Sequence, residues 1–227
     1  MIISTGNEEL DMRIGGIPFP CLMLIEGGHG TGKTIISSQF SYGLLLNGKK
    51  GLIITTEQLT YDYIKKTKEV KINLVKHFLS GDLKIYPLNV SRFKWAKQIS
   101  NMLLNVISSI IAKGFDFVVI DSFSVIASFT DDEKILDFLK DARTQVKKGK
   151  AIIITVHPNV FPEGISTKIR SIVDVYYKLS ATSIGGRRVK VMERVKTIGA
   201  ISGGETISFD VDPDLGVKIV PLSLSRA

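Results

Sequence analysis

A glycine-rich segment near the start of the chain has the residue types and the spacing of a phosphate-binding loop. Residues 27–34 read GGHGTGKT, which fits the pattern GxxxxGK[ST] at every defined position. Glycines let the backbone wrap so that successive N–H groups point at phosphate oxygens. Lys33 would contact the β- and γ-phosphates of ATP or another nucleoside triphosphate, and the Thr34 hydroxyl would ligate Mg²⁺. The expected contacts are Gly28, His29, Gly30, Thr31, Gly32, Lys33, Thr34 and Ile35.

Two carboxylates occupy positions where they could complete such a site. Asp121 follows the apolar run FVVI, so a buried strand would deliver it to the sheet edge beside the loop, where it would hold Mg²⁺ as a Walker B acid. Glu57 ends the strand expected after the loop helix, and its carboxylate could polarise a water for attack on the γ-phosphate. Buried strands also end in Asp without a function, and Glu57 could simply cap the next helix.

A histidine lies at the end of another apolar strand. His157 follows the run AIIITV and precedes Pro158. Its side chain could report the presence of a γ-phosphate to the following loop, or it could be a strand-end histidine bonded to the backbone. The residues leave both interpretations open. No Cys/His cluster has the spacing of a metal site.

Alternating strand and helix patterns position these residues. Strands are expected at residues 21–26, 51–56, 83–86, 117–120 and 151–156, and helices at residues 33–46, 61–69, 95–112 and 133–146. Residues 174–179, 188–194, 207–210 and 217–220 look like strands without long helices between them, and Gly185–Gly186 is a hairpin signal. The pattern predicts one α/β domain over residues 1–227, with a mainly parallel sheet flanked by helices and antiparallel strands at the C-terminal end.

Composition narrows the class of protein. The 227 residues contain one cysteine and carry a net charge of +8. No stretch of 18 or more apolar residues suggests a membrane span, no secretory signal is expected, and the single cysteine suits a reducing cytoplasm. The basic residues are spread out and do not interleave with aromatic residues as in a strand-binding groove, so nucleic acid is not the expected partner. The charge slightly favours an acidic partner surface.

Several segments carry a resemblance to a known family. Residues 5–11 (TGNEELD) and 15–18 (GGIP) lead into the loop, which is followed by Glu57 and Asp121. In this order they resemble the RecA superfamily, and more closely its KaiC-like branch, over essentially the whole chain. The phrases EGGHGTGKT, TTEQ and VVIDS and the ending ISFDVDPDLGVKIVPLSLSRA are most similar to the KaiC-like proteins of the archaellum motor, the motor of the archaeal flagellum.

This resemblance implies a RecA-like P-loop NTPase fold, with Lys33 and Thr34 on phosphate and Mg²⁺, Asp121 as the Walker B acid and Glu57 as the catalytic-type glutamate. It implies a cytoplasmic protein that assembles with itself into a ring, a hexamer. The ring would lie against the motor ATPase FlaI, a scaffold protein and the membrane platform at the archaellum base. KaiC has two adjacent glutamates where this chain has Glu57 and Gln58. That departure points to slow or absent hydrolysis, with ATP binding controlling assembly and docking.

A ring places nucleotides between subunits, where a neighbour's cation reaches the γ-phosphate. Arg194 and Lys196 fall about where KaiC carries such a pair, although order and spacing differ, and an exposed hairpin face is the other interpretation. Three further functions remain open: an actively cycling ATPase, an autophosphorylating enzyme and a DNA-binding recombinase paralogue. The recombinase fits the sequence least well, because the segment of residues 157–170, where a DNA-binding loop would be expected, is short and its only Lys or Arg residues are Lys168 and Arg170.

Overall fold

The computed structural model describes residues 1–88, 95–184, 187–197 and 205–220. Within these residues, nine strands form one sheet in the order β11-β10-β9-β8-β3-β7-β6-β4-β5. Their bounds are β3 Cys21–Gly27, β4 Gly51–Thr55, β5 Leu83–Pro87, β6 Phe117–Asp121, β7 Ala151–Val156, β8 Val175–Ile184, β9 Arg187–Thr197, β10 Thr206–Asp212 and β11 Gly216–Ile219. Strands β8, β3, β7, β6, β4 and β5 run parallel, and β9 to β11 continue the sheet antiparallel.

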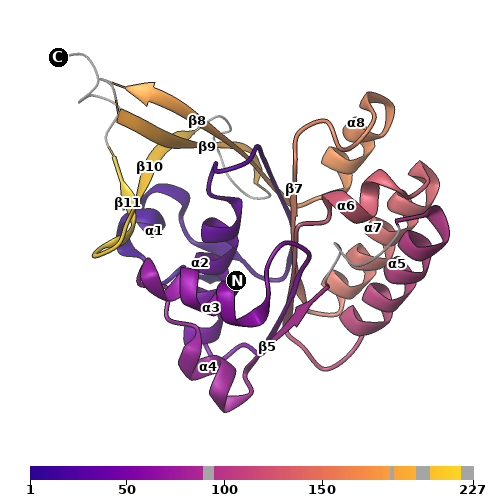
Figure 1. The fold of residues 1–227 in the computed structure, drawn as a ribbon, viewed down its shortest axis with the longest axis horizontal. Coiled ribbons are helices and arrows are strands. Elements are labelled where there is room, and N and C mark those ends of the chain that lie inside the picture. Colours follow the sequence, from indigo (N-terminus) through magenta and orange to yellow (C-terminus); the bar gives the residue numbers. More distant parts are fainter. Residues whose placement is uncertain (89–94, 185–186, 198–204, 221–227) are drawn as a thin grey trace.

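Helices cover both faces of the parallel part of the sheet, with α1 to α4 on one side and α5 to α8 on the other (Figure 1). Their bounds are α1 Glu8–Ile14, α2 Lys33–Leu46, α3 Thr60–Glu69, α4 Val75–Ser80, α5 Lys97–Ile111, α6 Ser124–Ser128, α7 Asp132–Lys147 and α8 Glu163–Ile172. A two-stranded sheet of β1 (Ile2–Ile3) and β2 (Ile17–Pro18) lies near the N-terminus.

Each central strand contributes to two hydrophobic cores because successive side chains of a strand point to opposite faces. In β3, Met23 and Ile25 pack into the core that contains Phe40 of α2. Leu22 and Leu24 pack into the core on the other face, beneath α5 and α7. Strands buried on both faces need apolar residues throughout, which explains the unbroken apolar runs.

The α/β fold with a mainly parallel sheet and antiparallel C-terminal strands is confirmed. Three expected helices begin or end one or two residues from their observed bounds, as in α5, which covers Lys97–Ile111. Helices α1, α4, α6 and α8 and strands β1 and β2 were not anticipated. The expected hairpin turn at Gly185–Gly186 lies outside the described residues. No helix in the described segments is long and apolar enough to span a bilayer.

Asn7 and helix α1, near the N-terminus, hold strand β11 in place. The Asn7 side chain accepts a hydrogen bond from the backbone N–H of Leu10 and so caps α1. The Asn7 Nδ2 also donates to the carbonyl oxygen of Val217 at 2.7 Å. Glu9 accepts from the backbone N–H of Ile219 at 3.0 Å. Helix α1 therefore fastens β11, and with it the antiparallel strands, to the body of the fold.

Candidate functional site

A cleft of about 390 Å³ lies at the carboxyl edge of the parallel strands, where ligands bind in open α/β sheets. Its lining includes most of the site residues predicted from the sequence, together with residues from three other elements. The lining consists of Gly28, His29, Gly30, Gly32, Lys33, Thr34, Ile35, Glu57, Gln58, Lys66, Thr67, His157, Lys190 and Val211.

The glycine-rich loop between β3 and α2 depends on backbone angles that other residues rarely adopt. Gly30 has a φ of 71° and Gly32, the N-cap of α2, has a φ of 97°. A Cβ on Gly32 would also lie 3.1 Å from the Phe209 ring of β10. The Thr31 hydroxyl donates to the carbonyl oxygen of Gly28 at 2.8 Å, so Thr31 braces the loop from within and is buried.

Lys33 is held inside the loop by the loop's own carbonyls. Its Nζ donates to the carbonyl oxygens of Gly27 at 2.7 Å and Gly28 at 3.0 Å, and the residue is only 7% exposed. Burial lowers its pKa, while Glu57 and Asp121 act in the opposite direction. A buried ammonium held by weak neutral acceptors is well suited to phosphate oxygens, because charged acceptors form the stronger hydrogen bonds.

Asp121 lies beneath the cleft lining, at the end of β6, and is 2% exposed. Thr155 of β7 donates its hydroxyl to Asp121 Oδ1 at 2.6 Å. Burial raises the pKa of Asp121, and hydrogen bonding from Thr155 and Thr34 partly offsets that effect. Asp121 and Thr34 together place carboxylate and hydroxyl oxygens side by side, which is the donor set that Mg²⁺ prefers.

His157 joins the loop lysine to Glu57. Its Nδ1 lies 3.5 Å from Lys33 Nζ and its Nε2 lies 3.4 Å from Glu57 Oε1. The ring of His29 lies 4.2 Å away between centroids. Burial first, and Lys33 second, lower the pKa of His157. The imidazole is therefore neutral at pH 7 and its side chain contacts site residues, while its main-chain N–H donates to Ser124 Oγ at 2.7 Å.

Gln58 adds a polar atom whose partner is not found in the described residues. Its Oε1 is buried and, within those residues, accepts no hydrogen bond. A buried acceptor without a donor is costly, so such an atom inside a cleft marks a place where a ligand or its bound water can donate. Together with the loop glycines and the Lys33 ammonium, this acceptor fits a hydrated triphosphate.

Four lining residues were not among the site residues expected from the sequence. Lys66 and Thr67 belong to α3, Lys190 to β9 and Val211 to β10. Lys190 Nζ lies 3.3 Å from Asp210 Oδ1, which holds it at the cleft margin. These segments are 30 to 180 residues from the loop in sequence, so only the folded sheet brings them together, and no local pattern could have identified them.

Arg194 and Lys196 lie outside the cleft lining and have partners within the chain. Arg194 forms an ion pair with Glu205 at 2.8 Å, and its side chain is 11% exposed. Lys196 Nζ donates to the carbonyl oxygens of Arg170 at 2.9 Å and Ser171 at 3.0 Å, at the end of α8. A role for either cation in a neighbouring subunit would require these contacts to open, and it stays a prediction.

The sheet order, the loop between β3 and α2 and the acid at the end of β6 define a RecA-like P-loop fold. A model of the family "ATPase: KaiC" matches residues 3–223. The archaeal flagellar ATP-binding protein FlaH of Sulfolobus acidocaldarius is 57% identical over 228 residues, covering 100% of both chains. The chain therefore belongs to the KaiC-like ATPase family and, within it, to the FlaH proteins.

Solved structures agree with this assignment. The crystal structure of the flagellar accessory protein FlaH from Methanocaldococcus jannaschii has a TM-score of 0.83 at 25% identity, covering 97% of this chain and 98% of that one. A KaiC-like protein from Pyrococcus horikoshii has a TM-score of 0.73 at 23% identity, covering 97% and 99%. At this lower identity, the similarity to the Pyrococcus protein shows a shared fold and nothing more.

Proposed function

We infer that the chain, as one nucleotide-binding domain, binds ATP with Mg²⁺ in this cleft and that binding controls its assembly. The observation that carries the proposal is the state of Lys33, a buried ammonium whose acceptors in the described residues, the carbonyls of Gly27 and Gly28 and Nδ1 of His157, are all uncharged. Phosphate oxygens are stronger acceptors than these carbonyls, so binding a triphosphate gives Lys33 better partners. The printed name of the Sulfolobus relative, an ATP-binding protein, supports ATP as the nucleotide.

Each site residue has a task in this proposal. Thr34 and Asp121 would hold Mg²⁺, which when bound neutralises charge on the phosphate oxygens. The loop backbone and the N-terminus of α2 orient the phosphates. Glu57 and Gln58 line the cleft and would orient water there. Gln58 cannot act as a base, so the site supplies one carboxylate for that step.

Assembly into a ring is the proposed consequence of binding. A ligand that binds only the assembled state stabilises it by RT ln(1 + [L]/Kd), about 2.7 kcal/mol when the ligand is at 100 times its Kd. That amount shifts assembly without a chemical step. The printed names of the relatives, archaeal flagellar ATP-binding proteins, support a role in the archaeal flagellum. We propose that the ring lies at the cytoplasmic face of the archaellum base, in contact with the motor ATPase FlaI and a scaffold protein. The ring is proposed to be a hexamer with slow or no hydrolysis.

A cycling ATPase is the second candidate, and the contact between His157 and Glu57 favours it. A histidine 3.4 Å from Oε1 would fix the direction of the Glu57 carboxylate, as a general base requires. Only one ionisable side chain of the Glu57–Gln58 pair is available, which favours slow turnover.

Mass in solution and phosphate release, followed together with and without ATP·Mg²⁺, separate the two candidates. Growth to a ring with negligible phosphate release supports control by binding. Steady phosphate release that Glu57→Gln abolishes would assign the chain to the cycling ATPases. A mass increase of the monomer by one phosphoryl group would indicate autophosphorylation instead. If ATP·Mg²⁺ neither binds nor changes the mass, the proposal is wrong.

A further inference from the structure

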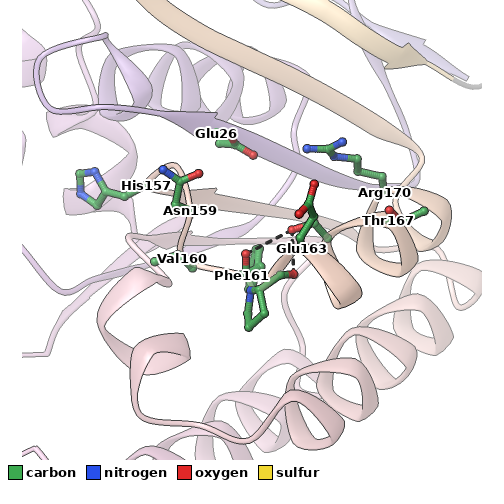
Figure 2. A pocket seen from close by; sticks show the side chains of 10 residues that line it. Glu26, His157, Asn159, Val160, Phe161, Glu163, Thr167 and Arg170 are labelled. Atoms are coloured by element: carbon green, nitrogen blue, oxygen red, sulfur yellow. Dashed lines mark hydrogen bonds between the residues drawn. The ribbon is translucent and has the colours of Figure 1, made fainter.

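His157 lines two cavities, the nucleotide cleft and a larger cavity of about 550 Å³ beside α8. Figure 2 shows Glu26, Glu163 and Arg170 around the larger cavity, with the His157 ring turned away from it. Opposite charges therefore already share that cavity. The imidazole belongs to the nucleotide cleft, where positive charge is in excess.

Three lysines contribute to the lining of the nucleotide cleft, against one carboxylate, that of Glu57. Even with Asp121 beneath the lining, the cations outnumber the acids, so the cleft attracts an anion. Lys33 belongs to the glycine-rich loop, and Lys66 is exposed on α3. Lys190 comes from β9, and its side chain is 22% exposed. A distant strand thus contributes a second, largely buried cation to the cleft.

The side chain of Lys190 lies against the glycine-rich loop. Residues two apart on a strand share a face, so Lys190 lies on the same side of β9 as Met192, which is fully buried in the core. Lys190 pairs with Phe209 of β10. A Cβ on Gly32 would lie 3.1 Å from the Phe209 ring and 3.3 Å from Cδ of Lys190. Because Gly32 is the N-cap of α2, the Lys190 stem passes the helix end where anions bind.

Arg188 brings a further positive charge to the loop, although it is not part of the cleft lining. It lies two residues before Lys190 on the same face of β9, and its Nη2 is 3.9 Å from the position that a Cβ on Gly30 would take. Arg188 is exposed, and in the described segments it forms no hydrogen bond or ion pair. Strand β9 therefore surrounds the loop with positive charge from within the same chain.

The partner that now holds Lys190 is an exposed carboxylate. Lys190 Nζ lies 3.3 Å from Asp210 Oδ1, and the Asp210 side chain is 53% exposed. The same oxygen accepts the backbone N–H of Val211 at 2.8 Å. An ion pair this open to water contributes little to stability, so the ammonium can leave Asp210 at small cost. Asp210 and an anion in the cleft would compete for one ammonium.

We propose that Lys190 binds the phosphate chain of the nucleotide held by its own loop, and that Asp210 competes with the phosphates for this lysine. The inference rests on the proposed function and adds a binding residue to it. Phosphate oxygens carry more charge than one carboxylate, so the exchange favours the nucleotide. Asp210 acts through Lys190 and sets the nucleotide affinity without touching the nucleotide. The cation comes from the same chain as the loop, whereas Arg194 and Lys196 were expected to act on a neighbour.

Opposite effects of the two partners on ATP·Mg²⁺ affinity test the proposal by calorimetric titration. Lys190→Met keeps the stem that packs on Gly32 and removes the charge, so binding should weaken about fivefold. Asp210→Asn keeps an oxygen for the Val211 N–H and removes the competitor, so binding should tighten about threefold. In the Lys190→Met background, Asp210→Asn should have little effect, because no ammonium remains to be released.

A second ion pair of the same kind provides the matched control. Lys140 and Asp137 lie 2.9 Å apart on α7, both exposed and outside the cleft lining. Lys140→Met and Asp137→Asn should leave the affinity unchanged. Raising KCl from about 0.05 to 0.3 M should weaken ATP·Mg²⁺ binding more in the wild type than in Lys190→Met, because salt screens only a charge that is present.

Three results would overturn the proposal. If both single replacements weaken binding, the ion pair serves only to join β9 to β10. If Lys190→Met binds ATP·Mg²⁺ as the wild type does, Lys190 does not contact the phosphates, and this inference fails alone. If Asp210→Asn tightens binding equally with and without Lys190, its effect is that of a distant charge. A wild type that does not bind ATP·Mg²⁺ would instead overturn the proposed function, and this inference with it.

Discussion

Lys33 Nζ and His157 Nδ1 lie 3.5 Å apart, although 124 positions separate the two residues in the chain. The neutral imidazole can accept a hydrogen bond from the ammonium at Nδ1 while Nε2–H is directed toward Glu57. One ring therefore connects the residue that binds phosphate to the residue that would activate water. A protonated ring would place two positive charges side by side, which explains why Lys33 contributes to the lowered pKa of His157.

The first prediction concerns pH and follows from His157. Because folding lowers its pKa below the unfolded value of about 6.5, the neutral ring contributes stability that is fully present above pH 6.5 and is lost as pH falls through the folded pKa. The free energy of unfolding of the wild type should thus decrease between pH 7.5 and 5.5 by more than that of His157→Gln. The slope difference is at most about 1.4 kcal/mol per pH unit.

Urea unfolding at several pH values measures this slope. His77→Gln is the matched control, since the pKa of His77 is also lowered, mainly by burial, and that side chain contacts Tyr42 rather than the cleft. The two variants should reduce the pH dependence independently. Equal slopes for the wild type and His157→Gln would show that His157 is not buried against Lys33 in solution.

Replacing the loop lysine should abolish tight nucleotide binding and leave the fold intact. Lys33→Met removes the charged donor and keeps the methylene length, so ATP·Mg²⁺ affinity should fall by at least about 30-fold, typical of lost charge-assisted hydrogen bonds. Calorimetric titration measures the loss. Lys65→Met, on the exposed face of α3, makes the same chemical change outside the cleft and should bind normally. Unchanged affinity in Lys33→Met would locate the nucleotide elsewhere.

Asp121→Asn should stabilise the free protein and weaken Mg²⁺-dependent binding. A buried carboxyl with a raised pKa stabilises the fold at pH values below its unfolded pKa, and this contribution is lost as pH rises through the folded pKa. The charged form of Asp121 therefore lowers the free energy of unfolding at neutral pH. Removing that charge should raise the free energy of unfolding at pH 7 by about 1 kcal/mol, as replacing functional polar groups often does.

The gain should disappear below about pH 3, where the wild-type carboxyl is protonated in most folded and unfolded chains. Unfolding curves in EDTA at pH 7 and at about pH 3 test the sign of this effect. The same variant should bind ATP equally well with and without Mg²⁺. Destabilisation at pH 7 would mean that the hydrogen bond from Thr155 outweighs the cost of burying the charge.

The sequence predicts those parts of the fold whose conformation depends mainly on their own residues. The strand before Asp121 and the loop around Lys33 follow from unbroken apolar runs and from fixed glycine spacing. Helix α8 was missed because its ten residues include Gly164, Ser166 and Thr167, which weaken the helical pattern. Ile165 and Ile169 of its amphipathic face are buried in the core that also contains α7, so tertiary burial decides its conformation.

Contacts between distant elements could not be deduced in this way. The position of Lys190 at the cleft depends on the antiparallel register of β9 with β8, and the register depends on the whole sheet. The sequence left two interpretations of His157 open, a reporter of the γ-phosphate and a strand-end histidine bonded to the backbone. Its contacts with Lys33 and Glu57 appear once β7 lies beside β3. The strand order of the sheet decides which residues of neighbouring strands lie side by side, and this order cannot be predicted from a single segment.

Gly32→Ala should separate backbone strain from steric overlap in the loop. At Gly32 the φ of 97° alone is unfavourable for alanine, and the new Cβ would also lie 3.1 Å from the Phe209 ring. We compare it with Gly48→Ala, where φ is 73° and no heavy atom lies within 4 Å of the new Cβ. Gly48→Ala should cost about 1 kcal/mol from the left-handed backbone, and Gly32→Ala about 1–3 kcal/mol more because Phe209 is fully buried and cannot move freely. Thermal unfolding of both variants measures the difference, and equal losses would mean that β10 does not rest on the loop in solution.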